Sequence, residues 1–443
     1  MNLNQKYKEQ EKKLRQIFNQ ALSASQPDNL VRNFIHLADD YLVVGKEKIQ
    51  LKGHQKIWVL GSGKAASVMA VALENKLASR IHGGVVICSK IPDTTKGKIR
   101  HLMASHPIPD EDSVSATQEL VSLAKSIPPD DLVIYVMSGG SSALLCMPPE
   151  EITLDIIRET HDALLNCGAN IHETNTVRKH MSIIKGGQLG QILKDVNVIS
   201  LNISDVPGDE LEDIGSGPLV RDSTTFVDAW QVLAKYSLLS VIPKMAVQYI
   251  EKGIKGIIPE TLKSDIEKHR HFVLGNATYT AQQASLEAEK LGYSTWLSDE
   301  AYSDDTHVIA DNICRSALSV LDRDEPVKKP AALIYYGESY LNVKGKGKGG
   351  RNQEMALTAS ISLEGRHYVS MLSAGTDGRD GPTDAAGAIC TGYTATLAGK
   401  AGIKPETYLK NNDSYHFFEA LGSLIITGDT GNNVMDLQIV LIE

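Results

Sequence analysis

The sequence predicts a protein of two α/β domains, the first built on a parallel sheet and the second smaller. Its 443 residues exceed one ordinary domain of roughly 100–200 residues. Short apolar, β-rich runs alternate with helical patterns, which is typical of parallel strands joined by crossover helices. A polar, helical stretch between about residues 240 and 270 separates two such series. We therefore expect one domain over residues 1–250 and another over residues 260–443.

The first segment, "MNLNQKYKEQEKKLRQIFNQAL", predicts an amphipathic helix docked on the protein. Leu14, Ile17, Phe18 and Leu22 recur in it at helical spacing. The segment is charged and lacks the apolar core of a signal peptide. No apolar run in the chain approaches the roughly 20 residues that span a bilayer, so we expect no membrane partner.

Composition narrows the classes of function. The net charge of −9 disfavours nucleic acid as a partner, because binding to a phosphate backbone needs basic surface. The five cysteines lie far apart with no C-x-x-C pair, which indicates neither a zinc site nor a disulfide framework. We expect a cytoplasmic enzyme that acts on small molecules.

The first predicted parallel strand, "KIWVLGSG", ends in a glycine turn before a helix. Gly61, Gly63 and Ala66 match the G-x-G-x-x-A spacing of dinucleotide-binding turns, but the next strand, "GGVVICSK", lacks the acidic residue that would hold a ribose. We therefore expect Gly61, Ser62 and Gly63 to bind a smaller anion such as phosphate. Lys64 would offset phosphoryl or carboxylate charge, unless it is simply a solvated surface lysine.

A second predicted strand, "DLVIYVMSGGSS", ends in another polar turn. Ser138, Gly139, Gly140, Ser141 and Ser142 either cradle a phosphate or form a tight, serine-capped turn. Both turns follow parallel strands, and the carboxyl ends of such strands meet at the ligand-binding edge of a sheet.

Charged residues follow in the next two segments. "NTVRKHMSIIKGGQL" (175–189) places Arg178 and Lys185 seven residues apart, which is one face of a helix. They would bind an anionic substrate there, or would simply meet solvent. Asp205 and Asp209 follow the strand "VNVISLNI", where carboxylates would hold Mg²⁺ close to a phosphate or would form turns.

The second half contains a glycine-rich basic segment and an aspartate-rich segment. "GKGKGGRNQE" (345–354) predicts a mobile loop in which Arg351, Asn352 and Glu354 are candidate substrate-binding residues, since a guanidinium binds carboxylate or phosphate with two hydrogen bonds. In "SAGTDGRDGPTDAAGA" (373–388), Asp377 is a candidate base or metal ligand, and a series of Asx-turns is the alternative.

These features together predict phosphoryl transfer in a cleft between the two domains. Cations and Mg²⁺ would offset the phosphate charge, and an aspartate would accept the proton of the attacking hydroxyl. The residues alone indicate a phosphotransferase or another enzyme with anionic substrates.

Eight motifs in this order resemble the glycerate 2-kinase family, whose C-terminal portion is called the MOFRL domain. They extend from about residue 10 to the end of the chain and read "GSGKAA", "HPIPD", "MSGGSSALL", "NTVRKHMSIIKGGQL", "SDVPGDELEDIGSGP", "GKGKGGRNQE", "SAGTDGRDGPTDAAGA" and "TGDTGNNVMDLQIVLI".

This resemblance implies a Rossmann-like first domain, a smaller second domain with its MOFRL region at about 330–440, and an active site between them. It implies phosphorylation of D-glycerate at its 2-hydroxyl with ATP and Mg²⁺, and it makes Lys64 and Arg351 essential. From the chemistry we add Asp377 as the general base and place Asp205 and Asp209 near Mg²⁺.

Two other functions stay open at this point. The glycine spacing also suits an NAD(P)-dependent hydroxypyruvate reductase, and the anion-binding turns also suit a non-catalytic sensor of anionic metabolites. The sequence does not decide whether the chain forms a homodimer.

Overall fold

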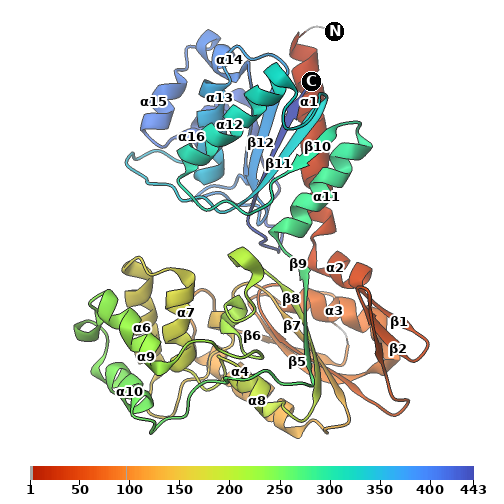
Figure 1. Ribbon diagram of the computed structural model, residues 1–443, viewed down its shortest axis with the longest axis vertical. Helices are drawn as coiled ribbons and strands as arrows, with labels where there is room; N and C mark the ends of the chain where they lie inside the picture. Colours follow the sequence, from red (N-terminus) through yellow and green to blue (C-terminus); the bar gives the residue numbers. More distant parts are fainter. Residues whose placement is uncertain (1–2, 96) are drawn as a thin grey trace. The chain divides into compact units, whose positions relative to one another are not determined.

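A computed structural model describes residues 3–95 and 97–443 of the protein and divides into two compact units (Figure 1). The parallel-sheet unit comprises residues 27–274. The mixed-sheet unit comprises residues 1–26 together with 275–443. The boundary expected near residues 250–260 therefore lies within the parallel-sheet unit, and the N-terminal helix belongs with the second half of the chain.

The parallel-sheet unit is built on six strands in the order β6-β5-β4-β7-β8-β9. From β6 to β8 every neighbouring pair is parallel, as the continuous apolar runs predicted. A separate antiparallel sheet of three strands precedes it along the chain. The strands of this unit are β1 (Ile35–Ala38), β2 (Tyr41–Val44), β3 (Glu47–Gln50), β4 (Ile57–Ser62), β5 (Ile81–Cys88), β6 (Ile99–Met103), β7 (Leu132–Met137), β8 (Asn197–Ile203) and β9 (His269–Gly275).

The helices of this unit cover the six-stranded sheet and form a helical cluster beside it. Helix α3 contacts β5, and α4 packs through Leu120 and Val121 into a core that includes Val85 and Tyr135. A second core, with Val177 and Phe226, lies among α6, α7, α9 and α10. The helices are α2 (Pro27–Phe34), α3 (Ala66–Leu77), α4 (Glu111–Ser126), α5 (Ser141–Leu144), α6 (Leu154–Asn166), α7 (Ile171–His180), α8 (Gln188–Ile192), α9 (Phe226–Lys235) and α10 (Lys244–Ile254).

The register of the parallel sheet brings three strand ends together. Ser62 at the end of β4 lies opposite Met137 at the end of β7, and Met137 lies opposite Asn202 of β8. The turns that follow these strands therefore leave the sheet at the same edge.

The mixed-sheet unit has six strands in the order β10-β11-β15-β12-β13-β14. Only β10 and β11 pair in parallel; each of the other neighbouring pairs in this sheet of described residues is antiparallel. The strands are β10 (Ser294–Leu297), β11 (Ala331–Gly337), β12 (Val369–Gly375), β13 (Gly387–Thr391), β14 (Leu424–Ile425) and β15 (Asp436–Ile442).

Helices cover both faces of this mixed sheet. One core joins Phe18 and Ala281 with Ile439, and the other joins Ile313 and Leu357 with Val440. Figure 1 shows α1 and α11 together on one side of the sheet and α12 and α13 on the other. The helices are α1 (Leu3–Ala24), α11 (Ala277–Lys290), α12 (Thr306–Arg323), α13 (Arg351–Ser362), α14 (Thr394–Lys400), α15 (Pro405–Lys410) and α16 (Ser414–Leu421).

The predicted docking of the N-terminal helix is confirmed. Leu14, Ile17 and Phe18 of α1 are at most 1% exposed, and they pack against α11 and the mixed sheet. In the described residues, no helix combines the length and apolar character that crossing a bilayer requires.

Replacing Phe18 with Ala should destabilise the mixed-sheet unit. A buried phenylalanine reduced to alanine costs about 3–5 kcal/mol of unfolding free energy, because a cavity is left between α1 and the sheet. Urea denaturation followed by circular dichroism measures the loss. Gln20→Ala on the exposed face of α1 is the control; equal stability of the two variants would contradict the docking.

Candidate active site

The two glycine turns of the parallel-sheet unit interlock at the carboxyl edge of the sheet. The backbone N–H of Lys64 donates to the carbonyl of Gly139 at 3.0 Å, and the N–H of Ala65 donates to the hydroxyl of Ser138 at 2.9 Å. The N–H of Gly63 donates to Ile87 of the neighbouring strand. The donors of the first turn are therefore used within the protein.

Most of the predicted serine ligands also have internal partners. Ser62, Ser138 and Ser141 are buried. The hydroxyl of Ser62 bonds to those of Ser141 (2.5 Å) and Tyr135 (2.8 Å), and that of Ser142 bonds to Ser216 (2.8 Å). These hydroxyls fix the two turns against each other. They do not cap α5, whose N-cap residue is Gly140.

The open backbone donors lie on the second turn. In the described part of the chain, the N–H groups of Gly139 and Gly140 have no hydrogen-bond acceptor. A Cβ on Gly139 would collide with Asp205, and Gly140 adopts a φ of +82° with the His106 ring 2.8 Å from where its Cβ would lie. The positive φ of Gly140 favours glycine, a Cβ on Gly139 would force Asp205 to move, and two adjacent free N–H groups are suited to bind an anion.

These two glycines line a cavity of about 230 Å³ within the parallel-sheet unit. The cavity is bounded by the second turn, by the ends of α6 and α7, and by the segment after β8. Its lining residues are His106, Pro107, Gly139, Gly140, Ser142, Ala143, His161, Leu165, Ile171, Arg178, Asp205, Val206, Asp213 and Gly215.

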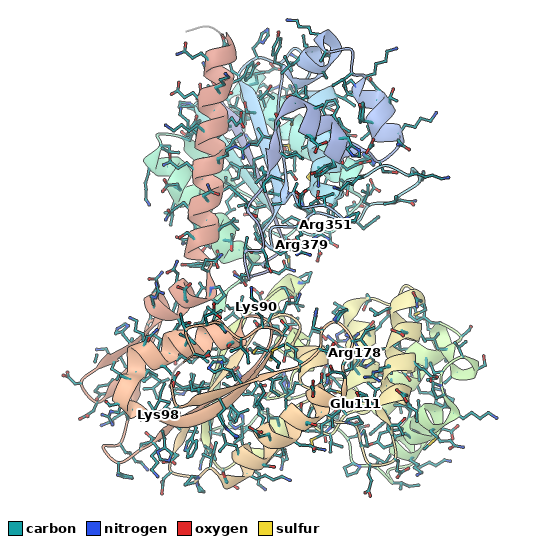
Figure 2. The ribbon with its side chains drawn as sticks, turned by 180° about the vertical axis from the view of Figure 1, so that it is seen from behind. Lys90, Lys98, Glu111, Arg178, Arg351 and Arg379 are labelled. Atoms are coloured by element: carbon teal, nitrogen blue, oxygen red, sulfur yellow. The ribbon has the colours of Figure 1, made fainter. Side chains whose placement is uncertain are left out.

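Arg178 supplies this cavity with an unneutralised positive charge. It lies in the last turn of α7, is half-buried, and is labelled in Figure 2. Its Nε is buried without a hydrogen-bond partner, and no carboxylate of the described residues pairs with it. Burial lowers the pKa of the guanidinium. A buried cation without a partner favours an anionic ligand.

Lys185 adds a second buried cation close to Arg178. Helix α7 ends at His180, so the two residues do not share a helical face as predicted; the turn after α7 brings them together instead. The Nζ of Lys185 donates to the carbonyl of Leu145 at 2.6 Å. Burial lowers the pKa of Lys185 to about 8, with a further contribution from Arg178, so the ammonium stays charged at neutral pH.

Lys64 lies beside the same turn. Its backbone is fixed by the bond to Gly139, while its side chain is exposed and passes Gly140, with Cγ 3.1 Å from where a Cβ would lie. The lysine that follows the first glycine turn therefore borders the open donors of the second.

The two candidate metal ligands occupy different places. Asp205 lines the cavity beside Gly139, whereas Asp209 lines a separate surface hollow with Glu210 and Arg221. No cluster of three or more acidic, histidine or cysteine side chains in the described residues is arranged to hold a metal ion. Mg²⁺ in phosphoryl-transfer sites commonly takes one or two carboxylates and completes its shell with phosphate and water, so Asp205 fits such a site.

The neighbours of Arg178 in the sequence have structural roles. Lys179 is fully buried and forms ion pairs with Asp222 (3.0 Å) and Glu212 (3.4 Å). His180 bonds to Thr176 and Glu260. In this basic segment Arg178 therefore faces the cavity, whereas Lys179 and His180 belong to an internal network of ion pairs and hydrogen bonds.

In the mixed-sheet unit, Arg351 begins α13 and is held by two carboxylates. It donates to Asp436 from Nε (2.6 Å) and Nη2 (3.0 Å), and its Nη1 lies 2.6 Å from Glu338. Burial disfavours the charged guanidinium, but these carboxylates outweigh burial and raise the pKa of Arg351. Neither partner was predicted from the sequence; they meet because Asp436 lies in register with Gly337 and Gly375.

Asp377 lies just after β12 near this arginine. It is partly exposed, and its Oδ1 accepts from the N–H of Arg379 at 3.0 Å. Its carboxylate and that of Asp436 both approach Gly375. The other two aspartates of the segment are structural: Asp380 accepts the first N–H groups of α13, and Asp384 accepts from Tyr415.

The glycine-rich segment before α13 is docked rather than free-standing. The N–H groups of Lys344 and Gly345 donate to Asn412, and that of Lys348 donates to Asp413. Asn352 and Glu354 are each 1% exposed and have partners inside the unit. Of Arg351, Asn352 and Glu354, Arg351 therefore has the most accessible side chain.

Comparison with known proteins agrees with the motif order. Residues 13–251 match a family described as a domain of unknown function (DUF4147), and residues 331–436 match the MOFRL family. A glycerate 2-kinase from Pyrococcus horikoshii is 36% identical over 427 residues, which cover 96% of this chain and 95% of the relative. The chain belongs to the glycerate 2-kinase family. A D-glycerate 2-kinase of Thermotoga maritima is 40% identical over 402 residues, 90% of this chain and 93% of the relative.

Solved structures share the fold of this glycerate 2-kinase family member. A glycerate kinase from Thermotoga maritima superimposes with a TM-score of 0.87 at 36% identity, covering 98% of this chain and all (100%) of the other. A protein from Pyrococcus horikoshii OT3 gives a TM-score of 0.88 at 35% identity over 97% and 98% of the two chains. The protein is therefore an α/β kinase with a Rossmann-like domain and a MOFRL domain.

Lys179→Met should destabilise this kinase by about 3–5 kcal/mol, because Asp222 would be left buried without its cation. Urea denaturation at pH 7 measures the change in unfolding free energy. Lys125→Met, at an exposed position of α4, is the matched control. A Lys179 variant as stable as the control would show that the ion pair is not needed.

Glu354→Gln should stabilise the protein at high pH and leave it unchanged at low pH. Burial raises the pKa of Glu354 from 4.5 to about 7, so the folded state carries an increasing penalty as the pH rises between these values. The gain in unfolding free energy should be close to zero at pH 4.5 and reach at most about 3 kcal/mol at pH 8. Denaturation at both pH values tests this; a gain independent of pH would contradict the shifted pKa.

Proposed function

We propose that this protein transfers the γ-phosphoryl group of ATP to the 2-hydroxyl of D-glycerate and releases 2-phosphoglycerate and ADP. The relatives from Pyrococcus horikoshii and Thermotoga maritima are named as a glycerate 2-kinase and a D-glycerate 2-kinase, and both align over at least 90% of this chain. Both ligands are anions, so their site must provide positive charge and hydrogen-bond donors.

One observation carries the proposal: the cavity of the parallel-sheet unit provides both. Arg178 lines the cavity without a carboxylate partner, and Gly139 and Gly140 bring two unused N–H groups. Lys185, buried behind the lining, adds a second positive charge close to Arg178. Such preorganised donors stabilise phosphate charge without reorganisation during the reaction. We assign the phosphate groups to this site.

Lys64 and Arg351 are both required in this proposal. Lys64 offsets charge on the transferred phosphoryl group, and Arg351 binds the substrate carboxylate or a phosphate oxygen once it gains that anion as a further partner. The 2-hydroxyl oxygen forms a bond to phosphorus, the bond from phosphorus to the ADP oxygen breaks, and Asp377 accepts the hydroxyl proton.

In this proposal Asp205 is the carboxylate that binds Mg²⁺. When bound, the ion would neutralise phosphate charge. The chain's own part is to present the Asp205 carboxylate beside the Gly139 turn, where a larger residue than glycine would displace it. Asp209 lies in a separate hollow, so we propose that it adds negative charge near Mg²⁺ without binding the ion.

Phosphorus NMR of the products from ATP, Mg²⁺ and D-glycerate tests the function directly. Signals of ADP and 2-phosphoglycerate are expected, and chelation of Mg²⁺ should stop their growth. A signal of 3-phosphoglycerate would overturn the regiochemistry. Oxidation of NADH by hydroxypyruvate would support a reductase instead, and ligand binding without ATP consumption would support a sensor.

Lys64→Ala should lower kcat by about 100- to 1000-fold, since removal of one transition-state charge costs about 3–4 kcal/mol. Steady-state assays of ADP formation measure the effect. Lys125→Ala on the exposed surface of α4 should retain wild-type turnover, and both variants should keep the wild-type melting temperature because neither side chain is buried. Undiminished turnover of the Lys64 variant would refute its role.

A further inference from the structure

The ring of His106 lies beside the Gly139–Gly140 turn, whose N–H groups are open. The residue follows β6, is half-buried, and lines the cavity with Gly139, Gly140 and Asp205. Its Cδ2 and Nε2 lie 2.8 and 3.0 Å from the position that a Cβ on Gly140 would occupy. The Lys64 side chain approaches the same position, so imidazole and lysine lie on the same side of the turn.

The ring nitrogens of His106 are unused by the rest of the protein. Neither makes a hydrogen bond or ion pair with a described residue, and neither is sealed from the cavity, since they are absent from the buried, unpartnered polar atoms. Other histidines of the unit differ: His101, His172 and His180 each bond to a hydroxyl, carboxylate or carbonyl through Nδ1. His106 therefore has a donor and an acceptor available to a ligand.

We propose that His106 binds the anion held at the Gly139–Gly140 turn by donating a ring N–H to one of its oxygens. The proposal rests on the proposed function for the identity of the anion, a phosphate of the nucleotide or the carboxylate of the sugar acid. It assigns a new ligand-binding residue, contributed by the "HPIPD" segment, to the cavity.

The surrounding charges explain why histidine suits this position. Burial, aided by the Lys64 charge, lowers the pKa of His106 to about 4, so the ring is neutral at physiological pH. A neutral imidazole donates one hydrogen bond without adding a third cation beside Lys64 and Arg178. The other titratable groups that line the cavity are His161, Asp205 and Asp213. A bound anion should raise the pKa of His106 by opposing Lys64.

Kinetics of two variants separate ligand binding from packing. His106→Leu keeps a comparable apolar volume and removes the donor, and should lower kcat/KM about 10- to 100-fold. His106→Gln restores an amide donor near Nε2 and should recover most of this loss. An increase confined to KM for ATP assigns the phosphate, and an increase confined to KM for D-glycerate assigns the carboxylate. His54→Leu, at an exposed position, is the control; equal losses for Leu and Gln would overturn the proposal.

A binding measurement on the wild-type protein does not depend on turnover. Histidine-selective ¹⁵N NMR at several pH values, with and without inorganic pyrophosphate or D-glycerate, follows the His106 ring, identified by its absence in His106→Gln. A rise of its pKa with either ligand supports the proposal, even if the protein forms no 2-phosphoglycerate and the proposed function fails. An unchanged His106 signal at ligand saturation, judged from other shifted signals, would overturn it.

Discussion

The interlocking of two glycine turns determines the chemistry of the parallel-sheet unit. Because β4 and β7 run in parallel register, the turns after them approach closely enough for Lys64 and Ala65 to donate to Gly139 and Ser138. That contact consumes the N–H groups of the first turn, which has the glycine spacing of a dinucleotide site. It leaves the N–H groups of Gly139 and Gly140 open, so the anion-binding geometry belongs to the second strand end.

Arg178 and Arg351 differ in whether a carboxylate of the protein neutralises their charge. Arg178 is left without a carboxylate partner, so its desolvation is unfavourable until an anion arrives. Arg351 is bound by Asp436 and Glu338, which fix the plane of its guanidinium and keep it charged. The first arrangement favours ligand affinity, and the second favours a fixed orientation.

Sequence patterns predicted the elements better than they predicted side-chain partners. The parallel strands, the docked helix and the meeting of the strand ends follow from local periodicity and from the geometry of parallel sheets. The partners of Arg351 depend on the antiparallel register of β15 with β11 and β12. Strand β15 lies more than 60 residues along the chain from both of these strands, so no local pattern specifies the register. The same limit explains Arg178 and Lys185. Their spacing suggested one helix, but α7 ends at His180, and the turn that follows it brings them close together.

The chain path also sets the order in which the protein can be completed during synthesis. Helix α1 precedes the parallel-sheet unit in the chain, yet its apolar face packs against a sheet whose interior strand β15 follows that unit. Lys13 of α1 pairs with Glu443 at 3.2 Å. The parallel-sheet unit is continuous and can fold as soon as it has emerged, whereas Phe18 and its neighbours must wait through the translation of more than 400 residues. For that interval the apolar face of α1 has no sheet to cover it, so the long sequence separation of this contact delays the completion of the mixed-sheet core.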